Sequence, residues 1–406
     1  MELNWVGGAW RPSALSHDFQ LDSLLSPYLP RGRWPRSTPQ DLADAVLASK
    51  LASSDWQRME RCARCSILVR ALDELERARA AIAAGLAPGI GQPAEVLVAR
   101  ADADAQRARE GLEILRDGGE SRSGVGLFLA HWSDLASPLL MRLATWLLGG
   151  STAIVVADPG LPEAAGFLAR ALERAGLPPG VVALLHDDGR TLVRAAFEQA
   201  GLAWLRARGT RAEMQALEGL ARRGRAPAEL SLWPLACAVY GIPLRADPAE
   251  EAQRVLERAL SPSDTLCGQL PDAVGRVLCH QRQFSRFTAE LLDRLERSAH
   301  ADRPFAPVEA DLPGWMREAW ALGLDEGACP VFGEVSARAP GPPEPDPADG
   351  AEPPAVRGRA PRAVAPVVFT NVEPGGRLCG LERPAPLLRL ARVETDEEAL
   401  AASAPR

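Results

Sequence analysis

The sequence predicts an α/β fold in which a doubly wound, Rossmann-like parallel sheet domain precedes a truncated second α/β domain. Two observations predict it. From residue 125 onward, short apolar runs rich in β-branched residues alternate with helix-length amphipathic segments, and such crossovers place successive strands parallel and cover both faces of the sheet. In addition, the 406 residues are 47 % hydrophobic, which suffices for the cores of two domains.

The first expected elements are helices over residues 39–118. They begin after Thr38, a good N-cap, and carry apolar residues at i, i+3 and i+4 until the glycine pair at 118–119. The sheet is expected over 125–233, with strand-like runs such as "TAIVVAD" and "GVVALLH". Together these segments define a predicted first domain, 1–233.

Residues 234–406 form the predicted second domain. Strand-like "GRVLCHQ" and "VVFTNVEP" are separated by helical segments and by residues 339–366. That last stretch is dominated by Pro, Gly and charged residues, so we expect a disordered insertion there.

Composition excludes several function classes. The net charge is −7 and no basic tract is present, so neither nucleic acid nor a membrane is an expected partner. Lys50 is the only lysine, which leaves almost no room for lysine-dependent catalysis. Seven cysteines, an odd number, together with a start that lacks a signal-peptide pattern, predict reduced thiols in the cytoplasm.

Several phrases, in one order along the chain, resemble the aldehyde dehydrogenase superfamily. They are "SSDWQRMERCARCSILVRALDELE", "GGSTAIVVADPGLPEAAGFLARALERAGLPPGVVALL", "GQLPDAVGRVLCHQ" and "VVFTNVEPGGRLCGLERPAPLL". The resemblance implies an NAD(P)-binding domain and a catalytic domain. It also implies a mechanism in which a cysteine attacks the aldehyde, hydride passes to the nicotinamide, and a glutamate activates water.

The catalytic positions implied by the resemblance are mostly substituted. Pro271 stands where the family has its nucleophilic cysteine, and Ser231 stands where it has the general base. Ser133 follows Trp132, where the family has its oxyanion-binding asparagine. Proline has no nucleophilic atom and no main-chain N–H, and serine is not a base near neutral pH without a partner.

Cys267 offers the alternative nucleophile. It lies four residues before Pro271 on the same predicted loop. A displaced thiol loses most of the benefit of positioning, and an ordinary reduced cysteine beside a turn is the competing interpretation.

Some positions that bind the cofactor in the family are also substituted in this sequence. Val156 replaces the family's ribose-binding lysine, whereas Gly209 and Thr210 could still present amides to an anion at the start of a helix. Glu382 remains from the Glu-x-Phe-Gly-Pro motif. The expected cofactor is NAD or NADP, or none, and no metal is expected.

The family's oligomerisation arm and C-terminal end are missing from the matching stretches, so the usual homodimer is not expected. The sequence therefore predicts a degenerate aldehyde dehydrogenase-like protein, a pseudoenzyme that serves as an accessory or regulatory subunit with an active aldehyde dehydrogenase homologue. The alternative is an NAD(P)-dependent oxidoreductase that acts on aldehydes through Cys267.

Overall fold

A computed structural model describes residues 2–25, 30–118, 123–187, 191–198, 201–223, 229–298, 308–309, 311–335 and 364–401. The chain divides into two compact units, and the main division falls between Pro234 and Leu235. Residues 24–28 and 90–92 belong with the second unit although they precede that point. The predicted α/β architecture is confirmed, with parallel strands in both units.

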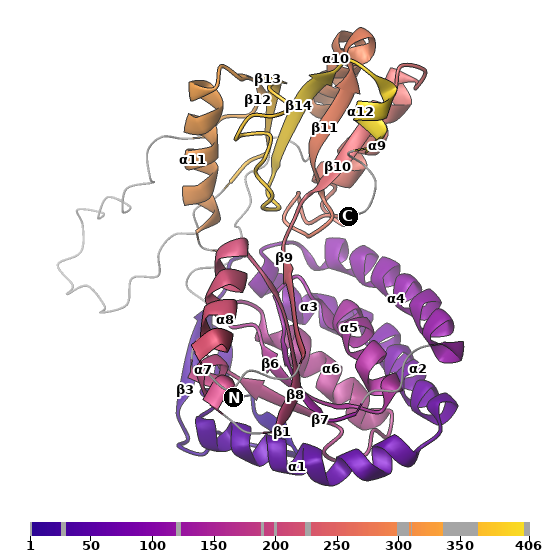
Figure 1. Ribbon diagram of the computed structural model, residues 1–406, viewed down its shortest axis with the longest axis vertical. Coiled ribbons are helices and arrows are strands. Elements are labelled where there is room, and N and C mark those ends of the chain that lie inside the picture. The colour runs from indigo at the N-terminus through magenta and orange to yellow at the C-terminus, as the bar shows by residue number, and fades with distance from the viewer. Residues whose placement is uncertain are drawn as a thin grey trace, which may run out of the picture. The chain divides into compact units, whose positions relative to one another are not determined.

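The first unit is built on a seven-stranded sheet with the order β2-β1-β7-β6-β5-β8-β9 (Figure 1). Its last five strands in the sequence pair in parallel, as predicted, while β1 is antiparallel to both of its neighbours. The strands are β1 (Asn4–Val6), β2 (Ala9–Arg11), β5 (Val125–Leu129), β6 (Thr152–Ala157), β7 (Val182–His186), β8 (Leu202–Gly209) and β9 (Glu229–Pro234). A separate hairpin, β3 (Asp18–Asp22) and β4 (Pro30–Pro35), was not predicted.

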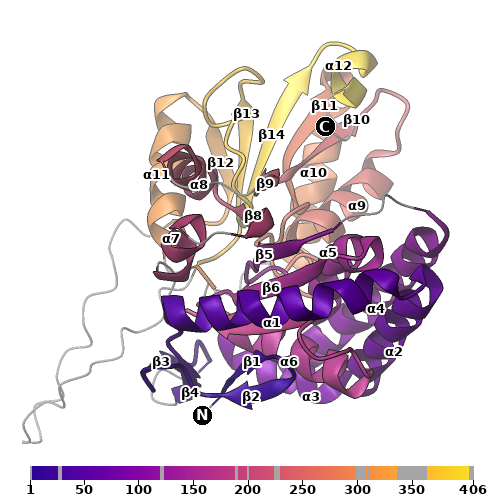
Figure 2. The ribbon, with the colours of Figure 1, turned by 60° about the horizontal axis from the view of Figure 1, so that its bottom comes forward.

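Helices cover both faces of this sheet. The first face carries α1 (Pro39–Arg58), α7 (Thr191–Glu198) and α8 (Arg211–Arg223), whose apolar residues share one core with the strands. On the other face Figure 2 shows the remaining helices of the unit gathered beneath the strands. These are α2 (Arg61–Arg77), α3 (Arg79–Ile90), α4 (Ala94–Asp117), α5 (Ala136–Gly149) and α6 (Pro162–Arg174).

The predicted start of the helical region is confirmed at its cap. Thr38 accepts a hydrogen bond from the Asp41 amide, and Asp41 returns one to the Thr38 amide, so two otherwise unpaired donors of the first turn are satisfied. Within the described part of the chain, no single helix is long and apolar enough to cross a bilayer. Taken together, α3 and α4 meet the length and composition test, but they are bent by 118° where they join.

The second unit has a five-stranded sheet with the order β10-β11-β14-β13-β12, in which β12 alone runs antiparallel. The strands are β10 (Ala238–Ile242), β11 (Val274–His280), β12 (Cys329–Phe332), β13 (Val367–Val372) and β14 (Leu387–Val393). Apolar residues of α9 (Pro248–Leu260) and α10 (Gln281–Arg297) share one core with the strands, and those of α11 (Leu312–Asp325) share another. The last described helix is α12 (Asp396–Ala401).

The predicted insertion at 339–366 falls largely on residues 336–363, which lie outside the described residues. Its last three residues are described, and there the prediction was wrong. Val364 is buried in the same apolar cluster as Val367 and Phe369. A single valine among prolines gives no periodic signal, so the sequence could not show where the core resumes.

Candidate functional site

The chain order of the first unit's sheet reverses at β5. β6 and β7 follow it on one side, whereas β8 and β9 lie on the other. In open α/β sheets, ligands bind beyond the carboxyl ends of the strands at such a reversal. Here the residues that follow β5 and β8 are His131–Asp134 and Thr210, so this is the candidate ligand site of the first unit.

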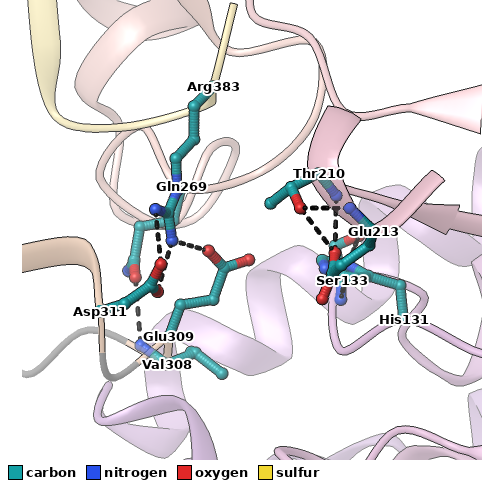
Figure 3. Close-up of polar contacts among 9 residues, drawn as sticks. All are labelled: His131, Ser133, Thr210, Glu213, Gln269, Val308, Glu309, Asp311 and Arg383. Atoms are coloured by element: carbon teal, nitrogen blue, oxygen red, sulfur yellow. Dashed lines mark hydrogen bonds and ion pairs between the residues drawn. The ribbon is translucent and has the colours of Figure 1, made fainter. Parts of the chain in front are cut away.

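Ser133 is engaged by its own neighbour (Figure 3). Its Oγ lies 2.8 Å from His131 Nδ1, and the Ser133 amide donates to the same nitrogen at 3.2 Å. His131 Nδ1 accepts a hydrogen bond from the Ser133 amide, so this nitrogen carries no proton. The Ser133 hydroxyl therefore donates to Nδ1 and does not accept from it. Both side chains are buried. The hydroxyl proton is therefore already used and is not offered to a developing oxyanion.

Asp134 is likewise held by the protein. Arg142 Nε lies 2.5 Å from Asp134 Oδ1, and Arg208 lies 4.0 Å from the same oxygen. Asp134 Oδ2 accepts a hydrogen bond from the His131 amide. This buried carboxylate is thus compensated by two arginines, and it fixes the turn after β5.

Glu213 occupies the start of α8, where Gly209 and Thr210 were the candidate cofactor residues. Its Oε2 accepts the Thr210 amide at 2.7 Å and the Thr210 hydroxyl at 3.0 Å (Figure 3). A Cβ added to Gly209 would lie 2.5 Å from the same oxygen. The carboxylate thus lies against the Gly209 main chain, so it brings negative charge to the place where a pyrophosphate would need donors. These residues, as arranged here, do not fit a dinucleotide phosphate.

Ser231 and Trp233 lie on the neighbouring edge strand, β9. The Ser231 hydroxyl has Glu229 as its hydrogen-bond partner, at 3.5 Å. The Trp233 ring stacks on the Arg206 guanidinium, whose carbon is 4.1 Å from the ring centroid. Arg206 also donates to the Arg142 carbonyl. The arginine that could have met an anion is therefore held against an aromatic ring.

In the second unit, the loop before β11 keeps a tight and unusual backbone. Leu266, Cys267 and Gly268 all have positive φ, at 48°, 56° and 86°. Non-glycine residues rarely adopt this left-handed conformation, and they hold it only where the surroundings enforce it. The Thr265 hydroxyl and carbonyl both accept the Gly268 amide, and the Thr265 carbonyl also accepts the Leu270 amide. Pro271 follows directly and is half-buried.

Cys267 does not present a reactive thiol. It is 7 % exposed, and Gln92 Nε2 lies 3.8 Å from its sulfur. Burial raises the pKa of the Cys267 thiol to about 12, against a smaller lowering effect of the Gln92 hydrogen bond. The thiolate, which is the nucleophilic form, is therefore scarce at neutral pH. This geometry counts against the Cys267 hypothesis.

A set of polar contacts, here called the clamp, holds the segment before α11 (Figure 3). It is formed by Gln269, Val308, Glu309, Asp311 and Arg383. Gln269 Oε1 accepts the Val308 amide at 3.2 Å. Arg383 donates to both carboxylate oxygens of Asp311, at 2.9 and 2.7 Å, and also contacts Glu309. Burial opposes the charge of Arg383, but the bonds to Asp311 and Glu309 outweigh it and raise its pKa. The clamp stabilises the loop in its present form.

The structure brings some predicted residues together and leaves others apart. Ser133 and the Gly209–Thr210 pair follow adjacent strands of the first unit, and Cys267 and Pro271 share one loop of the second. Glu382 contributes its main-chain carbonyl, which accepts the Cys237 amide at 2.6 Å. Glu213 and Arg383 were not predicted. The Thr-x-x-Glu spacing at 210–213 is a readable capping-box signal, whereas nothing in the sequence around Arg383 reveals its carboxylate partners.

Comparison with protein-family models gives a match to the "Aldehyde dehydrogenase family" over residues 28–311. One curated relative is acetaldehyde dehydrogenase 2 of Cupriavidus necator, 30 % identical over 205 residues, which cover 46 % of this chain and 40 % of that protein. Another is the alpha-ketoglutarate semialdehyde dehydrogenase of Haloferax volcanii, 24 % identical over 98 % of this chain and 82 % of that protein.

Solved structures agree on the fold. A salicylaldehyde dehydrogenase from Pseudomonas putida G7, complexed with salicylaldehyde, matches with a TM-score of 0.81 at 16 % identity, over 98 % of this chain and 82 % of that chain. A succinate-semialdehyde dehydrogenase from Burkholderia pseudomallei matches with a TM-score of 0.81 at 17 % identity, over 100 % and 83 %. At these identities the likeness establishes architecture alone.

Proposed function

Because the chain belongs to the aldehyde dehydrogenase family, we propose that it is a catalytically inactive member that serves as an accessory or regulatory subunit of an active aldehyde dehydrogenase. The observation that carries this proposal is Pro271. It takes the nucleophile's place in the Gly-Gln-x-Cys pattern, on a loop that is otherwise kept in a constrained conformation. A proline ring cannot attack a carbonyl carbon, and proline lacks the amide that would stabilise an oxyanion.

The residues at the positions of the oxyanion-binding asparagine and the general base do not replace those two groups either. Ser133 is bonded to His131 and Ser231 has Glu229 as its partner, so neither offers an amide donor or a base. Loss of a single oxyanion donor costs roughly 10²–10³-fold in rate, and loss of the nucleophile removes covalent catalysis altogether. Together these substitutions support a role for the chain that does not involve turnover.

Cofactor binding is part of the same proposal. Relatives of this fold include an NADP-dependent glyceraldehyde-3-phosphate dehydrogenase from Bacillus halodurans complexed with NADP. In the present chain, Glu213 holds the donors at the start of α8, and Val156 replaces the family's ribose-binding lysine. We propose that NAD and NADP bind weakly or not at all in the family's manner.

The accessory role follows from what is kept. The fold matches a salicylaldehyde dehydrogenase and a succinate-semialdehyde dehydrogenase with TM-scores of 0.81 over nearly the full chain. The positions that carry the family's chemistry are nevertheless substituted in this chain. A retained fold without its reaction is typical of a chain that acts through its surface. The proposed partner is an active aldehyde dehydrogenase homologue in the cytoplasm, where seven free cysteines would stay reduced.

Purified chain, incubated with short and aromatic aldehydes and either NAD or NADP, is expected to form no NAD(P)H above a protein-free control. The matched variant is Cys267→Ser, which should behave as the parent does. If aldehyde-dependent NAD(P)H appears in the parent and is lost in Cys267→Ser, the alternative is correct and the chain is an NAD(P)-dependent oxidoreductase that uses Cys267. Absorbance at the reduced-nicotinamide wavelength is the readout.

A further inference from the structure

Helix α1 carries a second apolar stripe, on the side that faces away from the sheet. Its inner side is buried and includes Leu42, Val46 and Trp56. On its outer side Leu47 and Leu51 are 59 % and 74 % exposed, and Figure 2 shows α1 in front of the strands of the first unit. Side chains four residues apart are neighbours on a helix, so the two leucines form one apolar patch.

The residues around these leucines continue their spacing along the whole of α1. Six exposed or half-buried residues follow one another at steps of four, three, four, three and four, and they are Gln40, Asp44, Leu47, Leu51, Ser54 and Arg58. Alternating steps of three and four are the spacing at which two helices meet in a coiled coil. At 1.5 Å per residue this row, here called the α1 seam, is about 27 Å long. The seam therefore has the spacing and length to pack against another helix.

The order of charges along the seam favours an antiparallel pairing with a second copy of the chain. In a parallel pair, Asp44 would lie opposite Asp44 and Arg58 opposite Arg58, so like charges would meet at both ends of the helix. In an antiparallel pair with its twofold axis at Ser49, the two ends of the helix are exchanged and these conflicts disappear. Leu47 of each copy then lies opposite Leu51 of the other, so the apolar patches cover one another.

The polar layers of the antiparallel register are complementary as well. The Arg58 guanidinium lies opposite Gln40 of the second copy, whose amide oxygen accepts hydrogen bonds. The Ser54 hydroxyl lies opposite the Asp44 carboxylate of the second copy and can donate to it. The seam is thus complementary to itself in this one direction, which specifies a second α1 as its partner.

The carboxylates beside the seam are compensated by arginines of their own chain. Arg11 Nη2 lies 3.0 Å from Asp44, and Arg58 contacts Asp55. Because Asp55 follows Ser54, the antiparallel register brings it beside Asp44 of the second copy. Each end of the pair then contains two carboxylates and two arginines, and no carboxylate is left without an opposite charge.

We propose that two copies of this chain pair through their α1 seams, in antiparallel register, as a weak and reversible homodimer. Stable interfaces bury about 1,200–2,000 Å² in total, whereas this contact rests on one helix from each copy. We therefore expect a dissociation constant on the order of 10–100 µM. The inference goes beyond the proposed accessory role and does not depend on it, since no seam residue lies at a substituted catalytic position.

The test is sedimentation velocity of the intact chain at concentrations between about 5 and 300 µM. The average mass is expected to rise from that of one chain toward that of two. Leu51→Glu places a carboxylate opposite Leu47 of the second copy and should weaken dimerisation by at least about ten-fold. The matched control is Ile114→Glu on α4, because Ile114 is 77 % exposed and lies outside the seam. A parent that stays monomeric throughout, or a dimer that Leu51→Glu leaves unchanged, overturns the proposal.

Cross-linking tests the register. Equal amounts of Leu47→Cys and Leu51→Cys chains are mixed and oxidised, and the linked peptides are identified by mass spectrometry. The disulfide between positions 47 and 51 is expected to exceed the 47–47 and 51–51 disulfides by at least about three-fold, since only the first joins directly opposed positions. An excess of either same-position disulfide contradicts the antiparallel pairing. If Leu51→Glu is misfolded by circular dichroism, this cross-linking pattern decides.

Discussion

Arg389→Leu is expected to lower the free energy of unfolding of the second unit by about 3–5 kcal/mol, because each buried acceptor that loses its donor costs about 1–3 kcal/mol. The main-chain carbonyls of Gly275, Leu378 and Leu381 all accept hydrogen bonds from the guanidinium of Arg389, which is buried on β14. A leucine side chain has no donor that could replace these bonds. The loss should also reach β11 and β14, which Arg389 connects through its bond to Gly275. Chemical denaturation, followed by hydrogen exchange of amides in these strands, measures the effect.

The matched control is Arg392→Leu on the same strand. Arg392 is exposed and stacks on the Phe284 ring, whose centroid is 4.6 Å from the guanidinium carbon. This substitution should change the free energy of unfolding by less than about 1 kcal/mol. Equal losses in the two variants would show that the buried bonds of Arg389 contribute no more than a surface arginine.

Mild acid is expected to destabilise the first unit through His186. This residue is completely buried at the end of β7, and burial lowers its pKa from 6.5 to about 3, opposed by a hydrogen bond to the Leu3 main chain. At a pH between those two values, His186 is protonated in the unfolded chain and neutral in the folded chain. Stability contributed by neutral His186 is therefore complete above pH 6.5 and declines as the pH falls toward 3. At pH 4.5 the loss is about 3 kcal/mol.

Urea unfolding of the parent and of His186→Gln, between pH 4 and 7, isolates this contribution, since glutamine does not titrate. Other groups contribute equally to both proteins, so the difference between the two pH slopes is the relevant quantity. The parent should lose stability more steeply below pH 6.5. Parallel slopes would mean that His186 is protonated in the folded state or is reached by solvent.

Much of the fold could be predicted from local patterns. Alternation of apolar strands with amphipathic helices predicted the parallel strands β5 to β9, and Thr38 predicted the start of α1. The hairpin β3–β4 was missed because its signal is short and one-sided. β3 alternates polar and apolar residues over only five positions, and β4 contains two prolines, a glycine and two arginines without alternation. Val364 was assigned to the disordered insertion because it lies between Pro361 and Pro366 at the end of a proline-rich stretch, although its side chain lies in the core.

The candidate site could be predicted only in part. The substitution at Pro271 is visible by comparison of motifs. The burial that raises the pKa of Cys267 depends on residues distant in the sequence, because Cys267 lies in an apolar cluster with Leu312 and Val367. The Glu213 contact with Thr210 is local and could have been read from their spacing. Two partners of Arg389, Gly275 and Cys237, lie 114 and 152 residues before it in the sequence, and no local pattern connects them with Arg389.

The loop from Ser261 to Asp272 is expected to contain no usable nucleophile. The most direct measurement is acylation of the folded chain by an activated ester at neutral pH, with the peptide that contains Cys267 analysed by mass spectrometry. An inert loop predicts that this peptide gains no acyl group unless the chain is first unfolded. Rapid acylation of Cys267 in the folded chain would contradict the account.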